Sequence, residues 1–260
     1  MTDKIVLRDR KNPQLWQSWK YWDELMQLRK RHLLRISAIE RGASNYDVQF
    51  EHDVMEHMGM NALLKDAVKM MVNYGTAIPV WPWITGIRGL KQGSLAAQLL
   101  SQIDDIARFD TVSKLWRFAG YAVINGERDR LKAGEKAPYS TRLKSTCYLV
   151  SESFIKQQTP GYVGIYYAEK ERQQEQHPVK MCKQCGIPWD DCTQKKKHYA
   201  EFTPNHLHLR AMRKMTKIFL QHLWVEWRTA EDLPVTLPYA HAIMGHSRYL
   251  NSELVTELVV

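Results

Sequence analysis

Long apolar segments are missing from this 260-residue sequence. No stretch reaches the roughly 18 apolar residues of a membrane-spanning helix. The first residues, MTDKIVLRDRK, also lack the apolar core of a signal peptide. We therefore expect a cytoplasmic protein that has no membrane partner. The sequence contains no internal repeat.

Cysteine is scarce, with four residues in the chain. Cys182, Cys185 and Cys192 lie close together, a pattern that favours a metal site in a reducing compartment over a disulfide framework. Cys182 and Cys185 form a Cys-x-x-Cys pair, and His198 follows at a spacing that allows a Cys3His tetrahedron. Such a set predicts structural Zn²⁺ in a closed four-ligand site. His206 and His208 are alternative fourth ligands, and three ordinary thiols are the alternative to a metal site.

Positive charge and apolar residues are both abundant. Hydrophobic residues make up 44% of the chain, enough for an ample core. Thirty-seven Lys and Arg outweigh 28 Asp and Glu and leave a formal net charge of +9. This excess favours a polyanionic partner, nucleic acid above all, although a basic protein can also be merely soluble.

The apolar periodicity predicts a mainly α-helical protein. Residues 12–75 are expected to form two or three helices separated near Gly42 and Gly59. Further helices are expected over 111–119 and 140–157, and the clearest helical pattern covers 205–229. Residues 159–204 contain Pro, Gly, Gln and Lys runs, which indicate an insertion with little core of its own.

A glycine-bearing turn interrupts the helical pattern in the segment AIPVWPWITGIRGLKQGS. In a helix-hairpin-helix unit, such a turn exposes backbone N–H groups that bind a phosphate oxygen. Gly86, Ile87 and Gly89 fit this plan, although Arg88 takes the place of the usual second glycine. Arg88 and Lys91 would add charge to a phosphate contact. The alternative is an ordinary turn between two helices.

Two further basic segments are candidate nucleic-acid surfaces. The loop that follows Gly126 carries cations that could close on a backbone groove, or that are simply solvated: Arg128, Arg130, Lys132, Lys136, Arg142 and Lys144. At about 100° per residue, the last helix places apolar side chains on one side, for the core: Met212, Met215, Phe219, Leu223 and Trp227. Its opposite side carries cations that could lie along a phosphate backbone: Arg210, Arg213, Lys214 and Lys217.

One stretch of the sequence resembles a known family. The order ITGIRGL, a small-residue helix, DDIARFDTVSKLWRFAGYAVINGERDRLKAGEK and YSTRLKSTCYLVSESFIK covers roughly residues 80–157. It resembles the C-terminal domain of bacterial insertion-sequence transposases that pair a RuvC-like domain with a serine-bearing domain. The strongest part of the resemblance runs from Phe109 to Tyr121. It implies that the hairpin and basic loop bind DNA, that a structured guide RNA is a partner, and that a serine after the Ala-Gly pair is the nucleophile.

Two features separate this chain from that family. No Ser or Thr lies between Gly120 and Tyr139, so Ser140 is the nearest candidate nucleophile. The first 75 residues also lack the acidic strands with which a RuvC-like fold holds two metal ions. The resemblance therefore implies the binding surface more than the catalysis.

These observations together predict a helical bundle with a helix-hairpin-helix unit and a small zinc-binding insertion. We expect four regions: N-terminal helices over 1–75, the hairpin and transposase-like domain over 76–158, the zinc-knuckle insertion over 159–205, and a basic amphipathic helix with its tail over 206–260. The expected function is DNA binding through backbone phosphates, largely without sequence specificity, in a nucleoid-associated prokaryotic or phage context. The alternatives are a recombinase or nuclease that uses Ser140 or the acids Asp104 and Asp105, and a subunit that binds structured RNA. A homo-oligomer is also considered.

Overall fold

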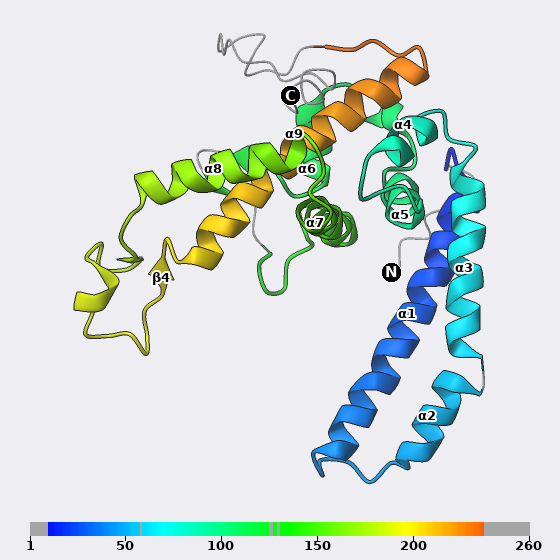
Figure 1. Ribbon diagram of the computed structural model, residues 1–260, viewed down its shortest axis with the longest axis horizontal. Coiled ribbons are helices and arrows are strands. Elements are labelled where there is room, and N and C mark those ends of the chain that lie inside the picture. Colours follow the sequence, from blue (N-terminus) through cyan, green and yellow to red (C-terminus); the bar gives the residue numbers. More distant parts are fainter. Residues whose placement is uncertain (1–9, 58, 125–126, 129–130, 237–260) are drawn as a thin grey trace. The chain divides into compact units, whose positions relative to one another are not determined.

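Helices dominate the structure, a computed structural model that describes residues 10–57, 59–124, 127–128 and 131–236 (Figure 1). For residues 124, 127 and 128 it describes the backbone alone. In these ranges the sheet consists of two short antiparallel pairs, β1 (Val123–Ile124) with β2 (Glu127–Arg128) and β3 (Met181–Cys182) with β4 (Ala200–Glu201). The expectation of a mainly α-helical protein is confirmed.

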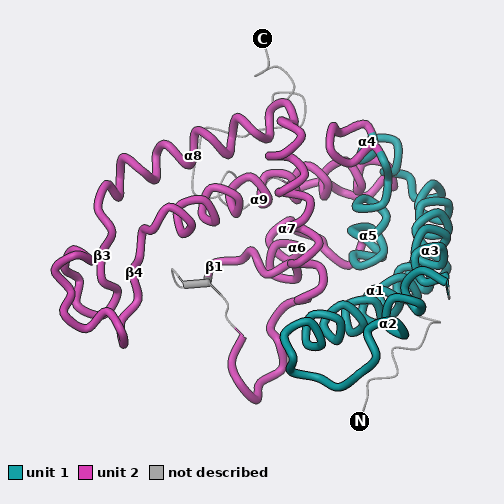
Figure 2. Tube along the Cα trace, turned by 60° about the horizontal axis from the view of Figure 1, so that its bottom comes forward, with its two compact units in different colours: residues 1–85, 92–106 teal, residues 86–91, 107–260 magenta. Residues whose placement is uncertain are grey.

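The described residues divide into two compact units (Figure 2). Unit 1 contains the chain up to Thr85 and the segment Gln92–Ile106. Unit 2 contains the segment Gly86–Lys91 and the chain from Ala107 onward. Each unit is thus built from two separate pieces of sequence.

Unit 1 begins with three helices, α1 (Pro13–Glu40), α2 (Val48–Glu56) and α3 (Met60–Gly75). They end and begin near Gly42 and Gly59, as the sequence predicts, and both glycines have a positive φ that other residues rarely adopt. The carboxylate of Asp47 starts α2 by accepting hydrogen bonds from the N–H groups of Gln49 and Phe50 at 2.7 and 3.1 Å. Apolar side chains then form a local core: Val54, Met55, Met60 and Leu64, with Trp22, Leu25, Met26 and Leu28 packed against them.

Two shorter helices flank the glycine-bearing turn, α4 (Trp81–Gly86) and α5 (Ser94–Ile103). Within unit 1, the Trp81 ring packs against Gly75 and Gly93. A Cβ atom added at Gly75 would lie 2.4 Å from this ring, and one added at Gly93 would lie 2.9 Å from it. Glycine is therefore required at both positions for the tryptophan to fit.

Unit 2 contains α6 (Val112–Phe118), α7 (Thr141–Lys156), α8 (Tyr162–Gln176) and α9 (Pro204–Ala230). The predicted core residues of α9, Met212, Met215, Phe219, Leu223 and Trp227, are all buried. This prediction is confirmed.

Two indole N–H groups also hold α9 against other parts of unit 2, one from α9 itself and one from α6. Trp224 is fully buried, and its indole N–H donates to the carbonyl of Phe109 at 2.6 Å. Trp116 of α6 donates to the carbonyl of Lys217 at 3.0 Å. A buried indole needs such a partner, so these contacts fix the position of α6 and the residues before it along α9.

The helix α8 was not expected from the sequence. Its N-terminal half buries Tyr162, Ile165 and Tyr166, and α8 packs along α9 (Figures 1 and 2). Its C-terminal half, KERQQEQ, carries no apolar side chain, which hides the helical period. The expectation of little core after residue 159 is therefore wrong for this helix, and the short strands and turns begin after it.

Across the described ranges, no helix has both the length and the apolar character that crossing a bilayer requires.

Candidate metal centre and cationic pocket

Three thiols and one imidazole meet in the loop between α8 and α9. Cys182 and Cys185 lie at the start of a tight turn in which the N–H of Gly186 donates to the carbonyl of Cys182 at 2.9 Å. Gly186 has a φ of +69°, a conformation that glycine adopts without strain. Pairing of β3 with β4 then returns the chain beside Cys182. Cys192 and His198 reach the cluster from the turns between these strands.

The geometry of this cluster fits a tetrahedral metal ion. Nδ1 of His198 lies 3.4, 3.2 and 3.5 Å from the Sγ atoms of Cys182, Cys185 and Cys192. All four candidate ligand atoms lie within 4.8 Å of one another. A tetrahedral zinc site with ordinary Zn–S and Zn–N lengths separates sulfur from nitrogen by about 3.6 Å. The four side chains therefore form a cluster compatible with a metal site.

The thiols have unequal acidities. Burial raises the pKa of Cys182, but hydrogen bonds from the backbone and thiol of Cys185 and from the backbone of Gln184 outweigh it and lower the pKa to about 6. The hydrogen bond to Cys182, together with burial, raises the pKa of Cys185 to about 11. A thiolate at Cys182 is the form that binds a metal ion.

The alternative fourth ligands are engaged elsewhere. Nδ1 of His206 accepts a hydrogen bond from the N–H of Phe202 at 3.1 Å. Nδ1 of His208 lies 2.8 Å from the hydroxyl of Tyr166. Of the three histidines considered, His198 is the one in the cluster.

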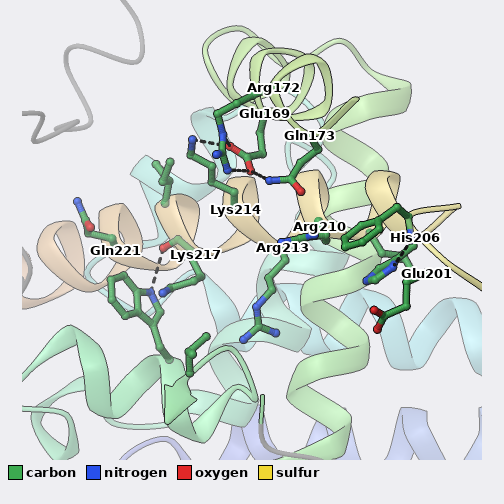
Figure 3. A pocket seen from close by; sticks show the side chains of 15 residues that line it. Glu169, Arg172, Gln173, Glu201, His206, Arg210, Arg213, Lys214, Lys217 and Gln221 are labelled. Carbon is green, nitrogen blue, oxygen red and sulfur yellow. Dashed lines mark hydrogen bonds and ion pairs between the residues drawn. The ribbon is translucent and has the colours of Figure 1, made fainter. Parts of the chain in front are cut away.

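Beside this loop, unit 2 forms a pocket of about 820 Å³ along α8 and α9 (Figure 3). Glu201 of β4 and Phe202 line the pocket, so the strand pair that carries Cys182 also forms part of its wall. Five cationic side chains line it: Arg172, Arg210, Arg213, Lys214 and Lys217. The four predicted cations of the last helix therefore do lie on one side of α9, and they face a pocket.

Two of the five cations neutralise a carboxylate. Glu169 of α8 accepts hydrogen bonds from Arg172 and from Lys214, the latter at 2.7 Å, and from Gln173 at 2.7 Å. Figure 3 shows these side chains gathered around Glu169. Burial raises the pKa of Glu169, but these hydrogen bonds outweigh it and lower the pKa to about 2. Glu169 is therefore ionised and already paired.

Two further cations, Arg213 and Lys217, contact backbone carbonyls and an aromatic ring. Nη2 of Arg213 donates to the carbonyls of Tyr121 and Ala122 at 2.7 and 2.9 Å. Nζ of Lys217 lies 4.1 Å from the centre of the Trp116 ring. Burial, and then repulsion from Arg213, lowers the pKa of Lys217. Among the described residues Lys217 has no carboxylate partner.

Arg210 contacts rings at the pocket's other end. Its guanidinium lies 3.3 Å from Nε2 of His177 and 5.6 Å from the centre of the Phe202 ring. Phe202 stacks on His177 with ring centres 3.7 Å apart, and its φ of +56° is unusual for a non-glycine residue. Burial, then Arg210 and Arg172, lowers the pKa of His177. A surplus of positive charge thus extends along the pocket.

Of the predicted hairpin residues, Gly86 ends α4 and the others lie in the turn between α4 and α5, all of them in unit 2. Gly86, Arg88 and Lys91 are exposed, whereas Ile87 and Gly89 are half-buried. The carbonyls of Arg88 and Gly89 accept hydrogen bonds from the side chains of Thr159 and Ser153 at 2.7 and 2.8 Å. The turn is therefore held by side chains 64 and 71 residues further along the chain.

The residues of the basic loop are scattered and mostly exposed. Lys132 and Lys136 are exposed, and Lys132 pairs with Glu135 at 3.6 Å. Arg142 is exposed on the first turn of α7, and Nζ of Lys144 lies 4.2 Å from the centre of the Tyr139 ring. Arg128 belongs to β2, where its side chain is not described, and Arg130 lies outside the described residues.

The candidate catalytic side chains have structural partners. Ser140 is the N-cap of α7, where its Oγ accepts from the N–H of Leu143 at 3.2 Å. Asp104 is buried and accepts from the N–H of Asn12 at 3.2 Å, while Arg10 lies 3.8 Å from its carboxylate. Asp105 pairs with Lys11 at 3.5 Å.

Sequence reasoning missed much of the pocket wall. Trp116, Arg172 and Phe202 come from three segments far apart in sequence, and Arg172 belongs to the unexpected helix α8. The aromatic residues carry no local signal for a pocket. The i, i+3, i+4, i+7 spacing of cations on α9 is the one part that the sequence displays.

No protein-family model matches this chain, and neither a curated protein nor a solved structure matches it. The functional argument therefore rests on the geometry of the two sites.

Proposed function

We propose that this protein binds nucleic acid, DNA in the first place, through backbone phosphates and largely without reading the base sequence. The observation that carries the proposal is the cationic side of α9, where Arg210, Arg213, Lys214 and Lys217 line one pocket with Arg172. Glu169 neutralises only part of this charge. Cations that replace condensed counterions on phosphates are the main source of sequence-independent affinity.

The glycine-bearing turn is proposed as a second phosphate contact of the helix-hairpin-helix kind. Thr159 binds the carbonyl of Arg88, and a trans peptide directs its N–H opposite to its C=O. The N–H of Gly89 therefore points away from Thr159, as phosphate binding by this turn requires. Exposed Arg88 and Lys91 add charge beside it.

We further propose that Cys182, Cys185, Cys192 and His198 hold structural Zn²⁺. Three thiols and an imidazole are a donor set that zinc prefers, and four protein ligands leave no position for a substrate. These four residues would hold the ion, and it would cross-link a loop with two-residue strands and little apolar core. Because Glu201 belongs to β4 and Phe202 follows it, the same cross-link would steady one wall of the cationic pocket.

We propose the relation to the transposase C-terminal domain for DNA binding alone, and we propose no catalytic activity. Ser140 serves as a helix cap, and Asp104 is committed to Asn12 and Arg10. A structured RNA is the competing ligand, since cations do not distinguish the two polymers well.

Fluorescence anisotropy with labelled duplexes of unrelated sequence tests the proposal. The wild-type protein should bind all of them with similar affinity, and the affinity should fall steeply with salt. The double variant Arg210→Gln with Lys217→Met should bind about tenfold or more weakly, with a log–log salt slope smaller by about 2.

The matched control removes two exposed lysines of α3, Lys65→Gln with Lys69→Gln, and should retain the wild-type salt slope. Absence of duplex binding at 50 mM salt would refute DNA as the ligand. If a structured RNA is retained under those conditions while duplexes are not, the RNA alternative replaces the proposal.

A further inference from the structure

The cationic pocket is an open concavity with room for a small ligand. Its volume of about 820 Å³ lies in the range of sites that enclose a small molecule, about 300–1,000 Å³. A pocket of this size has room for the end of a strand or a mononucleotide, and its open side leaves the same cations accessible to the backbone of a duplex. The volume therefore admits a compact phosphate-bearing group.

The charge inside the pocket also calls for an anion. Both carboxylates of its wall are already paired, Glu169 with Arg172 and Lys214, and Glu201 with Lys183 at 3.6 Å. Lys217 has no carboxylate partner among the described residues, and Arg213 repels it. A phosphate monoester, which carries up to two negative charges near neutral pH, would compensate the charge of Lys217.

The two cations are held in place before a ligand arrives. The carbonyls of Tyr121 and Ala122 fix the guanidinium of Arg213. Lys217 lies over the ring of Trp116, whose indole N–H is bonded to the backbone of Lys217 itself. Arg213 and Lys217 are four residues apart on α9, so their side chains are neighbours, and both line the pocket (Figure 3). Little side-chain entropy remains to be lost on binding.

We infer that the pocket between α8 and α9 binds a terminal phosphate monoester between Arg213 and Lys217, with Arg210 one turn away on the same helix. This inference rests on the proposed nucleic-acid binding and assigns it a preference for phosphorylated strand ends. The same phosphate chemistry is offered by a free mononucleotide, and the experiment separates the two sources.

The test compares three probes on the full-length protein at 150 mM salt. They are a single-stranded 12-nucleotide oligomer with a 5′-phosphate, the same oligomer with a 5′-hydroxyl, and adenosine monophosphate as competitor. The phosphorylated oligomer should bind at least about tenfold more tightly than the hydroxyl form, the gain expected of charge-assisted hydrogen bonds. If the source is a strand end, adenosine monophosphate should compete only at concentrations about tenfold or more above the oligomer's Kd.

Two variants examine the assignment of residues. Lys217→Met keeps an unbranched side chain over Trp116 and removes the charge, so the preference for the 5′-phosphate should disappear, whereas Lys217→Arg should retain it. Lys170→Met is the matched control. Lys170 also lies over an aromatic ring, that of Tyr166 at 5.8 Å, but it is not in the pocket wall, so its variant should keep the preference.

Equal binding of the two oligomers by the wild-type protein would overturn the inference and leave the proposed DNA binding intact. Failure of every nucleic acid to bind would instead overturn the proposed function. Tight binding of adenosine monophosphate, with equal binding of both oligomers, would assign the pocket to a free nucleotide and reject the strand end.

Discussion

Glu169 shows how one side chain sets the electrostatics of the pocket. It lies on α8, is almost fully buried, and accepts hydrogen bonds from Arg172, Gln173 and Lys214. The partners stabilise the ionised form more than burial disfavours it. The bond from Lys214 joins α8 to α9, so the charge state of this carboxyl group is linked to the stability of unit 2.

The acid dependence of stability should therefore change in Glu169→Gln. The pKa of Glu169 is lowered to about 2 in the folded protein, from an ordinary value of 4.5. A lowered folded-state pKa contributes stability that is present above about pH 4.5 and is lost as the pH falls toward 2. The variant should be less stable by about 1–3 kcal/mol at pH 7 and should lose less free energy of unfolding between pH 5 and pH 2. Urea unfolding at several pH values measures both effects, and parallel pH profiles would contradict the assignment.

Two elements illustrate what the sequence can and cannot predict. The periodicity of α9 is strong, because its apolar and cationic residues recur at helical spacing over 27 residues, so both of its faces could be predicted. The Cys-x-x-Cys turn could also be predicted, because its residues lie close together in the sequence. The helix α8 was missed, because only its first half has an apolar side. The pocket was missed because it joins Trp116, Arg172 and Phe202, whose proximity depends on tertiary packing.

The proposed metal ion should stabilise the loop that carries Cys182, Cys185, Cys192 and His198, whereas the helices should not depend on it. Chelation by EDTA should make the exposed run Lys195–Lys197 a site of rapid trypsin cleavage, while the helical circular-dichroism signal changes little. Cys182→Ser should show the same cleavage without a chelator. Cys147→Ser is the control, since Cys147 is buried in α7 outside the cluster. Equal resistance of the Cys182 variant and wild type would contradict a metal-dependent loop.

At the scale of the whole chain, the two compact units interrupt each other in sequence. The segment Gly86–Lys91 belongs to unit 2, although unit 1 lies on both sides of it along the chain. Its attachment depends on the hydrogen bonds that Ser153 and Thr159 donate to Gly89 and Arg88. These two side chains therefore anchor the turn to the rest of unit 2.

Removing one of these donors should destabilise unit 2. Thr159→Val keeps the shape of a buried side chain but leaves the carbonyl of Arg88 without its hydroxyl donor, so the free energy of unfolding should fall by about 1–3 kcal/mol. Ser145→Ala is a suitable comparison, because Ser145 is exposed on α7 and its hydroxyl donates only within its own helix, to Thr141. Chemical denaturation of both variants checks this, and equal midpoints would show that the bond to Arg88 contributes nothing.

The interleaving of the two units also sets an order of events during synthesis. The ribosome releases the carbonyl of Gly89 well before its partner Ser153, which lies 64 residues later. At about 5–20 residues per second, the turn waits about 3–13 seconds for that partner. Unit 1 cannot be completed until Ile106 has been added, and Ile106 is synthesised after the turn. The nascent chain therefore holds the glycine-bearing turn, still without its anchor, while the first helices are already able to pack.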